Sequence, residues 1–258
     1  MIKFFRADLR RLWKSPAFWL SLGGMLLICA GLMFMQATAM EYTVPLSRVI
    51  FLPLSLYGIG TASFVSFFVG EEFGGGFIRN KLLVARCRGD CLLSMIAVSC
   101  VGCILIYVVM TAFTGGVGAF FFENNVESSM LLCYFFLGLG TSVTLSCLFA
   151  VITLLCGNQA KGVLWCMALA FGMLFLCLHT NSVLVQPEYK DGILNFHYVG
   201  GIRRMIYALL HDLNPYGQAA QLSSWEVFSP LHCVLCDFVL VSVTTLIGWK
   251  KFSHQNVM

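Results

Sequence analysis

Long apolar runs separated by short polar connections dominate the hydrophobicity pattern of this chain. A transmembrane α-helix needs about 20 apolar residues, because it rises 1.5 Å per residue and must cross a hydrocarbon core roughly 30 Å thick. Six runs approach or exceed that length: residues 17–39, 49–70, 92–114, 130–156, 162–180 and 230–249. The pattern therefore predicts an all-α integral membrane protein with six transmembrane helices, in a single transmembrane domain over residues 1–258.

Residues 2–14 have a different pattern, in which apolar and basic side chains form separate helical stripes. The apolar stripe includes Phe5, Leu9, Leu12 and Trp13. Such an amphipathic helix is suited to the headgroup layer of a membrane, with Trp13 as an interfacial anchor. The simpler alternative is a solvated basic leader that only sets the topology. Pro16 suits the first turn of the helix that follows.

The first apolar run also has features of a signal peptide, since basic residues precede it and Ala37-Thr38-Ala39 resembles a cleavage site. The run is longer than the 7–15 residues of a typical signal core. We therefore expect it to remain as the first span.

The connection from residue 181 to 229 is long and partly apolar. Residues 202–213 have the pattern of an amphipathic helix, and Asn214-Pro215 ends it. Residues 216–222 can form a second short helix. We expect two short helices that dip into the outer edge of the membrane before the last span; a small folded external cap is the alternative.

Composition makes the segment 71–91 conspicuous. Only 11% of the residues are charged, against about 25% in soluble domains, yet this segment contains Glu71, Glu72 and five charged residues after them. The three consecutive glycines at 74–76 permit a sharp turn, and a short helix is expected to begin near Phe77. The apolar stripe expected on that helix is Phe77, Ile78, Leu82 and Leu83, with Arg79, Lys81 and Arg86 around it. A docking element has this character; the alternative is a solvated loop that holds the topology.

The distribution of basic residues sets the orientation. The leader, the segment 71–91, Lys161 and the C-terminal tail carry 12 Lys and Arg residues, and the connections on the other side carry 4. Because cytoplasmic connections are enriched in Lys and Arg, both termini and the segment 71–91 are predicted to be cytoplasmic. Cys87 and Cys91 should then be on the cytoplasmic side and Lys190 outside. The net charge of +4 is modest and is not arranged as a face that binds nucleic acid.

Few residues in the spans suggest chemistry. The 12 cysteines include Cys100/Cys103 and Cys233/Cys236, but neither pair has the second constellation that a zinc or redox site requires, so we expect free thiols and no metal site. Asp237 is an acid well within a span, where insertion costs roughly 2.5–3.5 kcal/mol. Either it lines a translocation path or it is a hydrogen-bonded structural acid. There is no phosphate-binding loop and no protease, hydrolase or kinase signature, so the chain is not expected to be an enzyme.

The order of these parts resembles the permease subunits of ABC-2-type transporters. The local match is Gly70-Glu71-Glu72-Phe73 followed by Gly76-Phe77-Ile78-Arg79-Asn80-Lys81-Leu82, and Asn214-Pro215-Tyr216 is similar to a turn in that family's external helices. The resemblance implies a multi-pass protein of a bacterial cell membrane that pairs with a second permease subunit, identical or homologous. Two copies of a soluble P-loop ATPase would bind ATP and Mg²⁺, so this chain would hold no cofactor.

The same resemblance implies that the partner ATPase contacts a coupling segment at 71–91. Its expected contact residues are Glu71, Glu72, Phe73, Phe77, Ile78, Arg79, Asn80, Lys81, Leu82, Leu83 and Arg86. Small bacterial members export, or protect against, antimicrobial peptides and other amphiphiles, which suggests the substrate class. The competing functions are a scaffold or sensor that transports nothing and an intramembrane enzyme, which the missing catalytic constellation disfavours.

Overall fold

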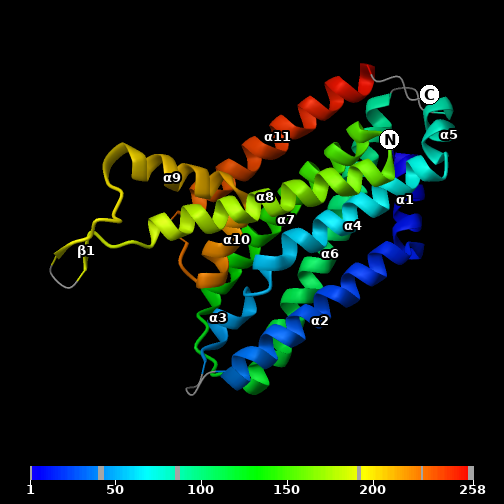
Figure 1. The fold of residues 1–258 in the computed structure, drawn as a ribbon. Helices are drawn as coiled ribbons and strands as arrows, with labels where there is room; N and C mark the ends of the chain where they lie inside the picture. The colour runs from blue at the N-terminus through cyan, green and yellow to red at the C-terminus, as the bar shows by residue number, and fades with distance from the viewer. Residues whose placement is uncertain (1, 40–43, 85–87, 191–192, 228, 255–258) are drawn as a thin grey trace.

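The computed structural model describes residues 2–39, 44–84, 88–190, 193–227 and 229–254. Within them, six helices are long and apolar enough to cross a membrane: α2 (Pro16–Ala39), α4 (Leu54–Gly74), α6 (Arg88–Phe121), α7 (Ser128–Cys156), α8 (Gln159–Leu184) and α11 (Pro230–His254). They run alongside one another in one bundle (Figure 1). The predicted class, a multi-span helical membrane protein, is confirmed by the length and hydropathy of these helices.

Three of the spans form the interior of the bundle. In the most apolar stretches of α4, α6 and α7, 67%, 56% and 61% of the residues are buried, against 22% in each of α2, α8 and α11. Helix α7 packs against α4, α6, α8 and α11. The peripheral helices therefore leave apolar faces uncovered, which a bilayer or another protein can cover.

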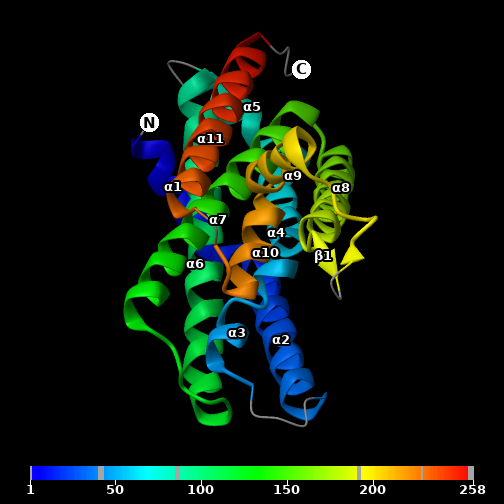
Figure 2. The same ribbon diagram turned by 90° about the vertical axis from the view of Figure 1, so that its left-hand side faces the viewer.

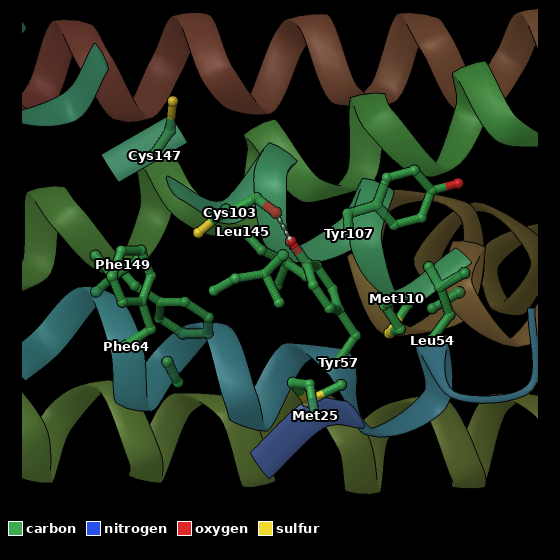
Figure 3. Packing of buried hydrophobic residues seen from close by; sticks show 14 of the residues in the cluster. Met25, Leu54, Tyr57, Phe64, Cys103, Tyr107, Met110, Leu145, Cys147 and Phe149 are labelled. Atoms are coloured by element: carbon green, nitrogen blue, oxygen red, sulfur yellow. Dashed lines mark hydrogen bonds between the residues drawn. The ribbon is translucent and has the colours of Figure 1, made fainter. Parts of the chain in front are cut away.

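Tyr57, in the first turn of α4, joins that helix to the middle of α6 and of α7. Its hydroxyl donates a hydrogen bond to the Cys103 carbonyl oxygen on α6 at 2.7 Å and lies 2.6 Å from Ser142 Oγ on α7. The aromatic and aliphatic side chains around it are buried (Figure 3). A polar group in an apolar interior is stable only when it is hydrogen-bonded, so this contact also restricts how α4, α6 and α7 pack.

At several glycines, side chains of neighbouring helices lie close to the backbone. A Cβ atom at Gly58 would lie 2.3 Å from the Tyr216 ring, and one at Gly138 would lie 2.3 Å from the Tyr107 hydroxyl. At Gly60 the nearest atom would be Met25 Sδ at 2.6 Å. Larger side chains at these positions would push the helices apart.

The second predicted span differs from a continuous helix. A short helix, α3 (Leu46–Ile50), precedes α4, and Phe51–Pro53 separates them. Proline has no backbone N–H and clashes with the preceding turn of a helix, so Pro53 precedes the first turn of α4 and does not lie inside a helix. The 49–70 prediction therefore combined two elements, although residues 46–74 together remain one candidate span.

The two short helices predicted at the basic end are present. Helix α1 (Ile2–Lys14) ends before Pro16, and α5 (Phe77–Val84) follows a glycine turn after α4. Gly76 has φ +67°, which favours glycine, and a Cβ atom at Gly75 would lie 2.3 Å from the Phe77 ring. The turn therefore depends on these glycines.

The long connection contains the two predicted helices and one element that was not predicted. Helices α9 (Gly201–Leu213) and α10 (Pro215–Ser224) meet at Asn214, whose Oδ1 accepts the Tyr216 N–H at 3.1 Å and whose Nδ2 donates to the Met173 carbonyl oxygen at 2.7 Å. Before them, β1 (Tyr189–Lys190) pairs antiparallel with β2 (Ile193–Leu194). Four paired residues give almost no hydrophobic alternation, which is why the hairpin left no pattern in the sequence.

Helices α1 and α5 and the C-terminal end of α11 lie at one end of the bundle (Figures 1 and 2). This placement agrees with an even number of spans. Cys91 is buried, which makes it unsuitable for labelling, and Cys87 lies outside the described residues. Lys161 and Glu188 are exposed positions on the two sides that the charge distribution distinguishes.

We expect a membrane-impermeant maleimide to label Glu188→Cys in intact cells and to label Lys161→Cys only after permeabilisation, because of the 12-to-4 distribution of basic residues. Both substitutions should be made in a Cys133→Ser background, since Cys133 is exposed. Labelling of Lys161→Cys, but not Glu188→Cys, in intact cells would show that the orientation is reversed.

Candidate functional site

Four charged residues at the α1–α4–α5 junction form what we call the α5 anchor cluster: Asp8, Arg11, Glu72 and Lys81. Lys81 Nζ lies between two carboxylates, donating to Glu72 Oε1 at 2.6 Å and to Asp8 Oδ1. The other oxygen of Asp8 accepts a hydrogen bond from Ser94 Oγ at 2.8 Å. One lysine of α5 is therefore bonded to α1 and α4, and through Asp8 it is connected to α6.

Arg11 completes the cluster from α1. Its guanidinium pairs with Glu72, donates to the Phe68 carbonyl oxygen, and lies 4.5 Å from the centre of the Phe68 ring. Glu71 Oε2 is 3.7 Å from the same group. Burial lowers the pKa of Arg11, while Glu71 and Asp8 act in the opposite direction. An arginine stays protonated in proteins, so its positive charge remains.

The cluster is poorly accessible to solvent. The side chain of Glu72 is 1% exposed, that of Asp8 4% and that of Lys81 15%. Two acids face two bases, so their charges compensate. Removing one partner from such a buried pair costs roughly 3–5 kcal/mol, because an uncompensated charge is left behind.

The predicted ATPase contacts divide into two groups by exposure. Glu72, Ile78 and Lys81 face the bundle, with Ile78 only 2% exposed, and Phe73 is partly buried. Phe77 and Leu83 are 57% and 84% exposed. Glu71 is partly exposed beside Arg11. Arg79, Asn80 and Leu82 belong to α5 but their side chains lie outside the described part of the structure, as does the whole of Arg86. Among the α5 side chains that the structure describes, Phe77 and Leu83 are the exposed apolar ones, and Ile78 belongs to the chain's own core.

The predicted membrane-surface helix packs on the bundle more than expected. Leu12 is fully buried, and both its side chain and the Phe64 ring of α4 lie close to Gly102 of α6. Phe5 and Leu9 are partly buried against the core. Trp13 remains 51% exposed. The sequence signal for this difference is Asp8, which lies three residues after Phe5 and four before Leu12. An acid on an apolar stripe indicates a protein partner, here Lys81, and not lipid.

A second group of polar residues lies where α7, α9, α10 and α11 meet, and we call it the α7–α11 polar network. It consists of Thr141, Thr144, Asp212, Gln218, Gln221, His232 and Asp237. His232 Nδ1 donates to Asp212 Oδ2 at 2.8 Å, and Gln221 Nε2 donates to Asp212 Oδ1 at 2.6 Å. His211 is buried nearby, its Nδ1 3.1 Å from Gln221 Nε2, and burial lowers the pKa of this imidazole.

The same network continues into the spans through Gln218. Its Oε1 accepts from Thr141 Oγ1 at 3.0 Å, and its Nε2 donates to the Asp212 carbonyl oxygen at 2.9 Å. One turn further along α7, Thr144 Oγ1 donates to Asp237 Oδ1 at 2.8 Å. These bonds satisfy polar groups within the chain. The sequence did not indicate Gln218 or Gln221, because amides between apolar residues have no motif.

Asp237, the predicted candidate for a translocation path, is 6% exposed at the α7–α11 contact. A Cβ atom at Gly140 would lie 2.7 Å from its Oδ2. The glycine therefore makes room for this carboxyl. The hydrogen bond from Thr144 supports the interpretation that Asp237 is a structural acid. A role of Asp237 in a translocation path stays a prediction.

The sequence predicted free cysteine thiols. The eleven described cysteines are free, and Cys100 Sγ lies 3.6 Å from Cys147 Sγ on α7. In the part of the chain that the structure describes, no group of three or more His, Cys, Asp or Glu residues could hold a metal ion.

The chain has no match among protein-family models, and none among the curated proteins.

We expect Lys81→Met to reduce the free energy of unfolding by about 3 kcal/mol, because Asp8 and Glu72 would share Arg11 alone. The apparent unfolding temperature should fall accordingly. Asp8→Asn added to Lys81→Met should restore part of the loss, since the charges balance again. The matched control is Lys161→Met at an exposed position, with an effect within about 0.5 kcal/mol. Equal stability of Lys81→Met and Lys161→Met in detergent would contradict an anchoring role for Lys81.

Gly140→Ala should destabilise the protein by about 1 kcal/mol, because its methyl group would contact the Asp237 carboxyl. In an Asp237→Ala background the same substitution should have little effect, and the double-mutant cycle measures that coupling. Gly172→Ala is the control, since a Cβ atom there meets nothing within 4 Å. A cost at Gly140 that does not depend on residue 237 would show that the contact is unimportant.

Proposed function

We propose that this chain is the membrane-spanning permease subunit of an ATP-driven ABC transporter, and that α5 docks into a separate P-loop ATPase. The observation that carries the proposal is the construction of α5. Phe77 and Leu83 face outward, while Lys81 of the same short helix is bonded to α1 and α4. Exposed apolar side chains on a firmly attached helix are suited to receive a partner and to transmit its displacement.

The displacement has a defined route into the membrane. A force on α5 acts through Lys81 on Glu72, which lies near the C-terminal end of α4. The interior of the bundle contains α4, and Tyr57 connects it to α6 and α7. Closure of two ATPase subunits would therefore act on interior helices of two permease subunits, and not only on a peripheral loop.

The division of labour follows from the sequence. The chain has no phosphate-binding loop, so ATP and Mg²⁺ would be bound by the partner ATPase, present in two copies. The second permease would be identical or homologous. The proposed substrate is an amphiphile such as an antimicrobial peptide or a lipid-like molecule, exported from or cleared from a bacterial membrane, as the sequence resemblance implies.

A scaffold or sensor subunit is the second candidate, because the same exposed pair on α5 could bind a soluble protein without any transport. The two functions differ in ATP dependence. A permease should co-purify with a stoichiometric P-loop ATPase, and its substrate should stimulate hydrolysis by the complex. A scaffold should retain its partner with no such stimulation.

Phe77→Ala combined with Leu83→Ala should reduce ATPase association by about tenfold or more, because exposed anchors at the centre of an interface commonly contribute above 1 kcal/mol each. Both residues are exposed and uncharged, so fold and topology should persist. The measurement is the amount of ATPase recovered with the purified permease, together with ATP-dependent transport.

The matched control is Phe120→Ala with Leu132→Ala, another exposed Phe–Leu pair, 87% and 59% exposed. It should leave association unchanged. Undiminished association and transport in the α5 variant would refute the docking role, whereas lost association without any ATP-dependent transport in the unmodified complex would favour the scaffold.

A further inference from the structure

A groove runs between α2 and α4 and is open toward the side of the bundle. It has a volume of about 570 Å³. Its walls include Leu20, Gly24 and Ile28 of α2 and Ile59, Ser63 and Phe67 of α4. Leu20 is 76% exposed and Phe67 44% exposed, so the described part of the chain leaves these walls uncovered. A concave, apolar surface of this kind is suited to bind an apolar molecule.

The length of the groove corresponds to one leaflet. On α2 its lining begins at Pro16 and ends at Ile28, which is about 18 Å of helix. Half of a hydrocarbon core is about 15 Å thick. An acyl chain that begins at the interface would occupy this length, whereas a transmembrane helix of a second subunit would need a groove of roughly twice the length.

Gly24 provides the room for such a chain. A Cβ atom at Gly24 would meet nothing within 4 Å, although the residue lies in the wall of the groove. The neighbouring Gly23 also has free space around it and does not line the groove. The two glycines therefore allow the groove to be filled, or left open, by otherwise identical substitutions.

A basic pocket of about 460 Å³ is lined by Arg10, Arg11, Trp13 and Lys14. These residues shortly precede Pro16, where the lining of the groove begins in the sequence. The two cavities are joined by an ion pair, since Arg11 of the pocket is 3.7 Å from Glu71 of the groove. Arg10 and Lys14 are exposed, and no described acid lies within ion-pair distance of either. Trp19 Nε1 donates to the Trp13 carbonyl oxygen at 3.0 Å, which places two tryptophans at this end, as is common at a membrane interface.

We infer that the groove and the basic pocket together bind one anionic glycerophospholipid of the leaflet beside α1. One acyl chain lies between α2 and α4, and the phosphate lies at Arg10 and Lys14. Arg11 lies 3.7 Å from Glu71 and also pairs with Glu72, so it reduces the repulsion between Glu71 and the headgroup. Because Arg11 also belongs to the α5 anchor cluster, the bound lipid would stabilise the position of α1 against α4. This inference does not depend on the proposed transport function.

The test is native mass spectrometry of the full chain in detergent, titrated with phosphatidylglycerol or with phosphatidylcholine of the same acyl chains. The unmodified protein should bind one phosphatidylglycerol in preference to phosphatidylcholine. Gly24→Leu should abolish this binding, because its side chain enters the groove, and Gly23→Leu should not.

Arg10→Gln with Lys14→Gln should keep the acyl-chain site and lose about tenfold of the preference for the anionic lipid. Lys161→Gln with Lys251→Gln removes the same charge away from the groove and should keep the preference. Equal lipid binding by the Gly24 and Gly23 variants, or an unchanged preference without Arg10 and Lys14, would overturn the inference. Dissociation of a permease dimer by Gly24→Leu alone would overturn it too, and would identify the groove as a subunit interface.

Discussion

The attachment of α5 depends on one lysine placed between two buried carboxylates. Lys81 alone would be costly to bury in this junction, and so would Asp8 or Glu72 alone. Together with Arg11 they form a compensated group that is stable only when α1, α4 and α5 are all in place. The ionic cluster is therefore an all-or-none constraint on this end of the bundle, whereas apolar contacts alone would tolerate sliding.

Different interactions hold the helices together within the membrane. Apolar side chains gain little by leaving lipid for a protein interior, so close packing and a few hydrogen bonds decide which helices associate. Tyr57 with Ser142, Thr144 with Asp237, and the glycines that receive neighbouring side chains are the contacts of this kind. Helix α7 carries several of them, which agrees with its contacts to four other spans.

Helix α4 connects the two ends of the molecule. Glu72 near its C-terminal end belongs to the α5 anchor cluster, and Gly58 near its N-terminal end receives the Tyr216 ring of α10. The two positions are about 20 Å apart along a continuous helix. A displacement of α5 would therefore reach α10 and the α7–α11 polar network through a single rigid element. The lipid inferred between α2 and α4 would lie along the same helix, on its outer side.

Much of this architecture could be predicted from local pattern. The six spans, the amphipathic α1, the glycine turn before α5 and the helix pair α9–α10 each follow from periodicity, capping residues or glycine at a position with positive φ. Each of these signals is contained in a dozen or so neighbouring residues, so no partner elsewhere in the chain is needed to read it.

Tertiary structure alone decided which side chains of these elements meet. Lys81 meets Asp8 across 73 positions of the chain, and Thr144 meets Asp237 across 93. The packing of whole helices decided that Ile78 and Leu12 face the bundle. A helical pattern shows that one face is apolar, but lipid and protein interior are equally apolar, so the pattern by itself does not show which of the two that face contacts.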